Sequence, residues 1–320
     1  MLSILYLLLG VGLLSAGGEV LIRGALGISR RLGVSPLLSG LVIVGFCTSM
    51  PEMVVCVDAA LNGQPDIAIG NVVGSNIANI FLILGLCAVI TPLSVSPTAL
   101  VRDAVVVILA SLLFIGLAWG AGLARFDGLL LLAVLVGYLA WAYWSEKDSP
   151  EPSGVVHQAE ATELQAVPKS LVWSTGATLL GLALLIAGSQ VLLSGAVGIA
   201  QLLGVSEAVI GLTMVAVGTS LPELTISVVA ALRRHADVAI GNILGSNIFN
   251  LLGILGVSAV VQPLNVSGRI ADFDQWVMLG AALLLFAFLY TSRRLSGLEG
   301  GIFLGGYSAY VIASYTVAAW

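Results

Sequence analysis

The sequence contains two copies of one long pattern, and the spacing between the copies is constant. Adding 171 to a residue number in the first half gives its counterpart in the second half, without a gap, from Ala16 and Ala187 to Ser96 and Ser267. For example, DIAIGNVVGSNIANI at 66–80 corresponds to DVAIGNILGSNIFNL at 237–251. About half of the aligned positions are identical. The chain therefore has to fold as two related halves.

Long apolar segments dominate both halves. Of the 320 residues, 59% are hydrophobic and 9% are charged, whereas a soluble domain usually has about 25% charged residues. Apolar runs of about 18 residues or more are typical of helices that cross a membrane. The sequence predicts an all-α integral membrane protein with ten transmembrane helices, at roughly 2–28, 36–61, 67–92, 98–119, 127–144, 171–198, 207–232, 238–262, 272–291 and 297–318.

A polar stretch divides the ten segments into two sets of five. It reads SEKDSPEPSGVVHQAEATELQAVPKS at 145–170, and its acidic, Pro-containing composition predicts a solvated linker. We therefore expect a first five-helix repeat at 1–144, a linker at 145–170 and a second repeat at 171–320. Because five is an odd number, the second copy has to enter the membrane in the opposite orientation, so the two repeats are expected to be inverted.

Basic residues indicate the orientation in the membrane, because Lys and Arg concentrate in cytoplasmic connections. With both termini outside, the cytoplasmic connections hold most of these residues and the outer connections hold only Arg125 and Arg269. The sequence thus predicts a multi-pass protein of the cell (inner) membrane with outside N- and C-termini and a cytoplasmic linker at 145–170. The cytoplasmic set is Arg30, Arg31, Arg102, Lys147, Lys169, Arg233, Arg234, Arg293 and Arg294.

A proline and a carboxylate interrupt the second apolar segment of each half, as CTSMPE at 47–52 and GTSLPE at 218–223. Proline has no N–H to donate to the carbonyl four residues earlier, so each helix is expected to open there. Free carbonyls and charged side chains inside a membrane usually line a polar cavity or an ion pathway. The alternative is a pair of kinked helices, each with a buried protonated glutamate. The duplication disfavours it, because both copies keep the carboxylate, as Glu52 and Glu223.

The third segment of each half adds further oxygen ligands. GNVVGSNIAN at 70–79 and GNILGSNIFN at 241–250 each contain two glycines four residues apart, which allow close helix packing. A serine and an asparagine four residues apart share one helix face in each copy. Hydroxyl, amide and carboxylate oxygens suit Na⁺ and Ca²⁺, and two carboxylates balance the charge of one Ca²⁺. The other asparagines lie on different faces, and we expect them to bridge helices: Asn71, Asn76, Asn242 and Asn247.

The two motifs together, GTS-x-PE and GN-x-x-GSN-x-x-N once per half, resemble the alpha repeats of the sodium/calcium exchangers of prokaryotic type, in the calcium/cation antiporter superfamily. These alpha motifs would span 40–85 and 211–256. The resemblance covers all ten segments. It implies a ten-helix inverted-repeat fold with four adjacent cation sites, and a secondary active antiporter that exchanges Na⁺ for Ca²⁺ by alternating access, with the first and sixth helices sliding.

The same resemblance implies a ligand set. Glu52 and Glu223 would bind both Ca²⁺ and Na⁺. The remaining ligands would be the carbonyls of Thr48 and Thr219, the hydroxyls of Ser49, Ser75, Ser220 and Ser246, the backbone oxygens of Gly45 and Ala216, and the central amides of Asn79 and Asn250. The chain departs from the family pattern at three positions: Cys47 stands for glycine, Met50 for leucine, and Asn250 for the aspartate of some relatives.

Two other functions remain open from the sequence. A calcium/proton antiporter of the same superfamily is the nearest alternative, although such relatives place an acidic residue where this chain has GSN. A cation channel with Glu52 and Glu223 in its filter is the second, and the inverted twofold repeat argues against it. The sequence has no nucleophile–base pair or phosphate-binding loop, so we expect neither an enzyme nor a cofactor. We also expect no nucleic-acid partner, and a monomer in the lipid bilayer with Ca²⁺ and Na⁺ as its substrates.

Overall fold

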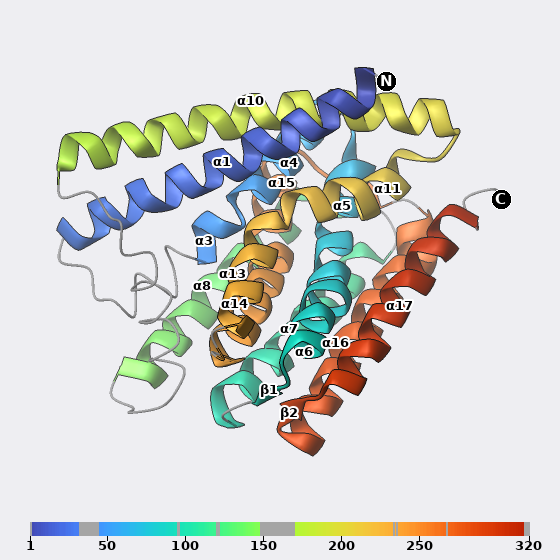
Figure 1. The fold of residues 1–320 in the computed structure, drawn as a ribbon. Helices are drawn as coiled ribbons and strands as arrows, with labels where there is room; N and C mark the ends of the chain where they lie inside the picture. The colour runs from blue at the N-terminus through green and yellow to red at the C-terminus, as the bar shows by residue number, and fades with distance from the viewer. Residues whose placement is uncertain are drawn as a thin grey trace.

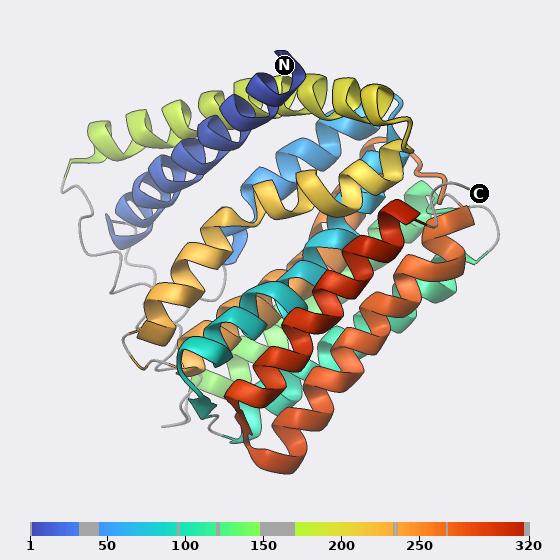
Figure 2. The ribbon, with the colours of Figure 1, turned by 45° about the vertical axis from the view of Figure 1, so that its right-hand side comes forward.

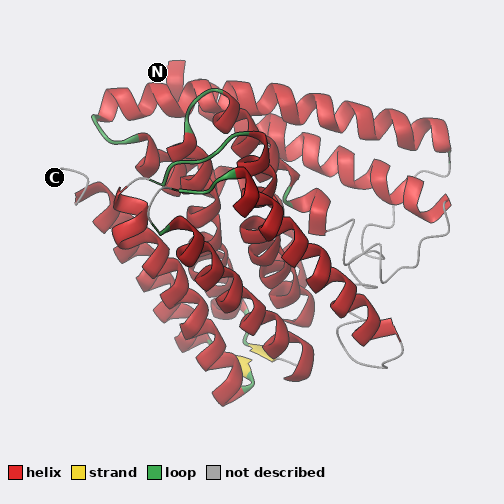
Figure 3. Cartoon of the chain, turned by 180° about the vertical axis from the view of Figure 1, so that it is seen from behind, coloured by secondary structure: helices red, strands yellow, loops and turns green. Residues whose placement is uncertain are grey.

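The computed structural model describes residues 2–31, 45–94, 97–119, 122–147, 170–232, 234, 236–266 and 268–316, and almost all of them are helical (Figure 3). The elements before the predicted linker are α1 (Leu2–Arg31), α3 (Gly45–Thr48), α4 (Met50–Leu61), α5 (Pro65–Ala78), the π-helical η2 (Asn79–Leu84), α6 (Gly85–Ile90), β1 (Leu93–Ser94), α7 (Pro97–Ala118) and α8 (Arg125–Lys147). Most of the predicted linker, 148–169, lies outside the described residues.

The second half has a corresponding series of helices, with the short strand in a different place. It comprises α10 (Leu171–Leu203), α11 (Glu207–Ile210), η3 (Gly211–Val215), α12 (Ala216–Thr219), α13 (Leu221–Leu232), α14 (Ala236–Ile248), η4 (Phe249–Ile254), α15 (Leu255–Val261), η5 (Ile270–Asp274), α16 (Gln275–Ser292), β2 (Arg294–Leu295) and α17 (Gly297–Thr316).

In the described part of the chain, seven helices are long and apolar enough to cross a membrane, or eight if one bent pair counts as a single span. Two of the ten predicted segments are not among them. Residues 36–44 of the second predicted segment lie outside the described residues. The tenth corresponds to α17, which is helical but rich in glycine and tyrosine. The chain is thus an all-helical protein with several membrane-spanning helices.

Two of these spans form the centre of the molecule. In Pro65–Ile90 and Val238–Val261, 78% of the most apolar window is buried, compared with 22% in Arg125–Ser145. The first central span is built from α5, η2 and α6, and the second from α14, η4 and α15. The two short broken helices α4 and α13 pack beside them. The core of the protein therefore lies where the two copies of the sequence motif meet.

The long helices α1 and α10 lie side by side across the other helices and run in opposite directions (Figures 1 and 2). Glycine allows this close packing. A Cβ atom added at Gly10 would lie 2.6 Å from the Leu192 backbone, and one added at Gly181 would lie 2.6 Å from the Leu21 nitrogen. Both pairs obey the 171-residue offset, so each helix makes the same contact with the other.

Each predicted break in the second segment is present, and it falls at a serine. Ser49 separates α3 from α4 with φ −88° and ψ 8°, and Ser220 separates α12 from α13 with φ −81° and ψ 12°. In the second half the two parts are bent by 50°. Pro51 and Pro222 occupy the first turn after the break, where a missing N–H removes no hydrogen bond within the helix.

The outer helix of each half packs on a central span of the other half. Helix α17 of the second half packs on α6 of the first half, and α8 of the first half packs on α15 of the second half. A Cβ atom at Gly85 would lie 3.1 Å from the Gly300 oxygen, and one at Gly256 would lie 3.1 Å from the Gly128 oxygen. The short pairing of β1 with β2 has the register Leu93↔Leu295, and an isolated bridge joins Leu123 to Leu264. Each half thus completes the packing of the other half.

Candidate functional site

Two glutamates meet at the centre of the molecule, each held by a serine of the other half. Glu52 and Glu223 are each 1% exposed. The Ser220 hydroxyl donates to Glu52 Oε1 at 2.9 Å, and the Ser49 hydroxyl donates to Glu223 Oε1 at 3.2 Å. The breaks at Ser49 and Ser220 place these hydroxyls at the ends of α3 and α12, opposite the first turn of the facing α13 and α4. The site is therefore built from both copies of the motif.

The central spans supply the next polar groups. The Ser246 hydroxyl donates to Glu223 Oε1 at 3.3 Å, and the Ser75 hydroxyl donates to the Ala216 carbonyl at 3.4 Å. Asn79 and Asn250, in the π-helical turns η2 and η4, are 0% and 1% exposed. The candidate ligands thus come from α4 and α13 on one side and from the two central spans on the other.

Four buried oxygens of this centre have no hydrogen-bond donor among the described residues: Glu52 Oε2, Glu223 Oε2, Asn79 Oδ1 and Asn250 Oδ1. A buried oxygen without a partner destabilises the fold by about 1–3 kcal/mol, and more when it is charged. The four form two pairs under the 171-residue offset. None of the ion pairs recorded in the described part of the chain involves either glutamate. An oxygen-rich, acidic centre of this kind fits a hard cation.

The structure brings most of the predicted ligands together. Buried at this centre are Glu52, Glu223, Thr48, Thr219, Ser49, Ser220, Ser75, Ser246, Asn79, Asn250 and Ala216. The Thr219 hydroxyl bonds Asn71 and the carbonyls of Val215 and Ala216, so its hydroxyl is engaged and only its carbonyl is offered as a ligand. Gly45 begins α3, three residues before Thr48.

The predicted bridging asparagines do bridge helices. The Thr219 hydroxyl donates to Asn71 Oδ1 at 3.1 Å, and Asn242 donates to the Ser227 hydroxyl at 3.0 Å. Asn76 and Asn247, which were also predicted to bridge helices, do so by holding the two candidate ligands. Those contacts are Asn79 Nδ2 to Asn247 Oδ1 at 2.9 Å and Asn250 Nδ2 to Asn76 Oδ1 at 3.4 Å.

That quartet of amides has a consequence for the ligand atoms. Each candidate ligand uses its NH₂ group to bind the amide of the opposite half, which leaves its carbonyl oxygen as the atom without a donor. The orientation of an amide is assigned from such contacts. Sequence reasoning missed this arrangement, although the i,i+3 spacing of two asparagines in both copies was a signal for it.

A buried carboxylate that sequence reasoning did not pair is Asp274. It is 0% exposed and binds Arg269 at 3.1 Å and the Tyr310 hydroxyl at 3.0 Å. In the first half, Asp103 binds Arg102 at 2.7 Å and the Tyr138 hydroxyl at 3.1 Å. These clusters lie at the ends of α7 and of η5–α16, outside the glutamate centre, and join neighbouring helices.

A bundle of membrane helices that buries two carboxylates and several other oxygen ligands at its centre defines a multi-pass ion transporter. A family model described as "Sodium/calcium exchanger protein" matches residues 2–144 and 173–316. The chain belongs to the sodium/calcium exchanger family.

Relatives along the full chain agree with this assignment. The chain is similar to "Putative antiporter CaxA" of Alkalimonas amylolytica, with 39% identity over 97% of this chain and 98% of that protein. It is similar to "Sodium/calcium exchanger MaX1" of Methanosarcina acetivorans, with 29% identity over 98% and 99% of the two chains. It also matches "Inner membrane protein YrbG" of Escherichia coli, with 31% identity over 98% and 97%.

Solved structures extend the similarity to the fold. The sodium-calcium exchanger NCX_Mj, in a structure soaked with 2.5 mM Na⁺ and 0.1 mM Ca²⁺, matches with a TM-score of 0.66 and 31% identity. That match covers 99% of this chain and 98% of the other. A structure of the same exchanger soaked with 2.5 mM Na⁺ and 0.1 mM Sr²⁺ matches with a TM-score of 0.67.

Proposed function

We propose that the protein is a secondary active antiporter that exchanges Na⁺ for Ca²⁺ by alternating access. The observation that carries this proposal is the set of four buried oxygens without donors, two on Glu52 and Glu223 and two on Asn79 and Asn250. A cation bound among them would satisfy all four. Two carboxylates would balance one Ca²⁺, and the same oxygens, with the serine hydroxyls, would serve Na⁺.

The proposed ligands are those that the sequence resemblance implies. They are Glu52, Glu223, Ser49, Ser220, Ser75, Ser246, Asn79, Asn250, the carbonyls of Thr48 and Thr219, and the backbone oxygens of Gly45 and Ala216. Burial and the cross-half hydrogen bonds support this set. Because Ca²⁺ and Na⁺ would share Glu52 and Glu223, one ion has to leave before the other binds, and this competition couples their movements.

The proposed architecture has ten transmembrane helices in two inverted five-helix repeats, 1–144 and 171–320, joined by a cytoplasmic linker at 145–170. Three observations support it: α1 and α10 run antiparallel, their glycine contacts repeat with the 171-residue offset, and the serine–glutamate contacts repeat with the same offset. Inverted repeats with the substrate between them are typical of secondary transporters. We further propose an inner-membrane location with both termini outside, and function as a monomer without a cofactor.

The coupling ion is the part of this proposal that needs a direct test. Reconstituted vesicles are loaded with Na⁺, and uptake of ⁴⁵Ca²⁺ is measured with a Na⁺ gradient alone and with a pH gradient alone. We expect uptake to follow the Na⁺ gradient and to ignore the pH gradient. Uptake driven by the pH gradient alone would establish the calcium/proton antiporter instead, and uptake that needs neither gradient would indicate a channel.

A pair of variants tests whether uptake of Ca²⁺ depends on the glutamate centre. Glu52→Gln keeps the shape of the side chain but removes one of the two charges, so we expect it to abolish uptake. Glu19→Gln is the matched control, because Glu19 is an exposed residue paired with Arg23 on α1. Equal loss in both variants would point to a general effect on folding or insertion.

A further inference from the structure

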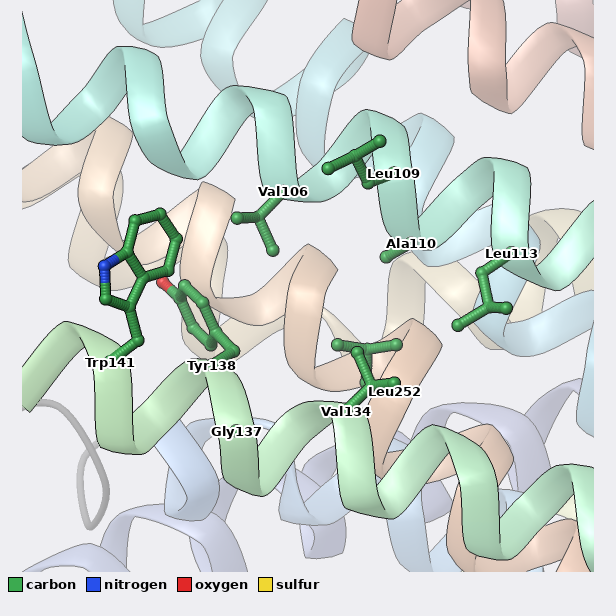
Figure 4. A pocket seen from close by; sticks show the side chains of 9 residues that line it. All are labelled: Val106, Leu109, Ala110, Leu113, Val134, Gly137, Tyr138, Trp141 and Leu252. Atoms are coloured by element: carbon green, nitrogen blue, oxygen red, sulfur yellow. The ribbon is translucent and has the colours of Figure 1, made fainter.

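A cavity of about 420 Å³ lies between α7 and α8. Figure 4 shows side chains of the two helices facing each other across it, with Leu252 of η4 between them. Leu109 is 58% exposed and Trp141 is 51% exposed, so the cavity opens toward the surroundings of two candidate membrane spans. It is lined by Val106, Leu109, Ala110, Leu113, Val134, Gly137, Tyr138, Trp141 and Leu252.

The chemistry of this cavity favours hydrocarbon over water. Its lining is apolar apart from the indole N–H of Trp141 and the Tyr138 hydroxyl, and that hydroxyl already binds Asp103 at 3.1 Å. A trapped water needs two to four polar partners, which this lining does not supply. The volume falls in the range of about 300–1,000 Å³ that is typical of ligand sites. Within a bilayer, the apolar material at hand is a lipid acyl chain.

One end of the groove has groups that suit a phosphate. The Arg102 guanidinium lies 5.6 Å from the centre of the Trp141 ring, and it also binds Asp103 and, at 3.0 Å, the Ser145 hydroxyl. Tryptophan and arginine near helix ends are typical of the membrane–water interface. Leu113 lies eleven residues farther along α7, a rise of about 16 Å. That is close to the depth of one leaflet, since the hydrocarbon core is about 30 Å thick.

We propose that this groove binds one phospholipid of the surrounding bilayer. Its phosphate lies at Arg102, and one acyl chain runs between α7 and α8 from Trp141 to Leu113. A guanidinium presents its N–H donors in a fixed fork that suits phosphate oxygens. The bound chain contacts Leu252, two residues from the candidate ligand Asn250, so the lipid supports η4 from the outside.

At the position that corresponds to Leu252 in the other half, the chain has a larger side chain, which packs against α17. Phe81 is the counterpart of Leu252 under the 171-residue offset. Its ring lies 5.6 Å from the ring of Phe303, and a Cβ atom added at Gly306 would lie 3.4 Å from it. Protein interiors are closely packed, and an unfilled gap loses dispersion contacts on its lining. The smaller Leu252 leaves space that a lipid chain fills in the first half.

Filling the groove is the direct test. Gly137 lines it, and a Cβ atom added there meets no atom within 4 Å, so Gly137→Leu places a side chain in the path of the acyl chain. Gly116→Leu is the matched control: it adds the same side chain to α7 at an equally open position outside the groove lining. Retained phospholipid is counted by native mass spectrometry after delipidation in detergent.

The expected result is specific to the groove. Wild type and Gly116→Leu retain one tightly held phospholipid, and Gly137→Leu retains about tenfold less, which corresponds to about 1.4 kcal/mol. Equal retention by wild type and Gly137→Leu would overturn the proposal. Equal loss in both leucine variants would also overturn it, because the retained lipid would then belong to the general lipid shell.

The phosphate contact has its own test, in wild-type protein and in Arg102→Gln. Delipidated protein is titrated with phosphatidylglycerol, with phosphatidylethanolamine and with a diacylglycerol of the same chains. We expect the two phospholipids to bind about tenfold more tightly than the diacylglycerol, and Arg102→Gln to remove this difference. Equal binding of all three lipids by wild type would show that Arg102 does not hold the headgroup.

Discussion

The two halves of the molecule agree at the centre and differ at the surface. At the centre, Ser220 binds Glu52 as Ser49 binds Glu223. Away from the centre, Asp58 corresponds to Val229, and Leu252, which lines the cavity between α7 and α8, corresponds to Phe81. Buried polar groups need partners, so a change in one has to be matched by its neighbours. Apolar surface in a membrane is covered by lipid whatever its shape, so the copies are free to diverge there.

The largest effect should come from breaking the symmetric centre. Glu52→Gln and Glu223→Gln each remove one of two charges, and we expect each to lower Ca²⁺ uptake by about 100-fold or more, since contacts to charged groups contribute about 1.5–3 kcal/mol each. Uptake of ⁴⁵Ca²⁺ into vesicles, normalised to inserted protein, measures this. Loss in one variant with wild-type uptake in the other would show that the halves do not share one site.

The next effect should appear in the pairing of α1 with α10. Gly10→Leu and Gly181→Leu each force a side chain into the backbone of the other helix, and we expect each to lower the free energy of unfolding by about 1–3 kcal/mol. Thermal unfolding in detergent measures the change. Gly12→Leu is the control on the same helix, because a Cβ atom added there meets no atom within 4 Å. Equal stability of all four proteins would contradict the packing described.

A smaller effect separates the two ions. Ser49→Ala and Ser220→Ala remove the proposed hydroxyl ligands of Na⁺ while both carboxylates stay in place. We expect the Na⁺ concentration that displaces Ca²⁺ to rise by about 5- to 30-fold, from a lost contact of about 1–2 kcal/mol, with little change in Ca²⁺ affinity in Na⁺-free medium. The two variants should behave alike if the halves are equivalent. A fall in Ca²⁺ affinity alone would mean that the serines serve the other ion.

The smallest effect should come from removing an asymmetry. Asp58 on α4 accepts a hydrogen bond from the Ser189 hydroxyl on α10 at 2.9 Å, whereas the counterparts of these residues are Val229 and Gly18. Asp58→Val makes the first half resemble the second, and we expect it to lower the free energy of unfolding by about 0.5–1.5 kcal/mol. Combined with Ser189→Ala in a double-mutant cycle, it should show coupling. Additive changes would mean that the contact contributes nothing to stability.

The features that could be predicted from the sequence are those that both copies of the motif share. The 171-residue offset and Pro51 located the breaks in the second segments, and the motif residues around Glu52 are buried together as expected. The proline pattern located the break to the turn between Cys47 and Pro51, and the structure places the change of direction within that turn, at Ser49. Proline fits the first turn of a new helix better than the middle of an old one.

Other features had no signature along the chain. The π-helical turns η2 and η4 lie in the two spans that are mostly buried, with 78% of the most apolar window buried in each. A helix that is apolar on most of its faces has little periodicity, so the sequence pattern does not reveal these turns. The exchange of α8 and α17 between the halves depends on contacts such as Gly85 with Gly300, which are distant in sequence. Sequence spacing specifies the faces of single helices but not which distant helix covers them.

The exchange of outer helices also sets an order of events during synthesis. Helix α6 ends at Ile90, and the helix that covers it, α17, begins at Gly297. A ribosome that adds about 5–20 residues per second takes roughly 10–40 s to cover that distance. Until then, the face of α6 around Gly85 is in contact with lipid or with the insertion machinery. The first half therefore reaches its final packing only after the last described helix has been made, and the two halves mature together.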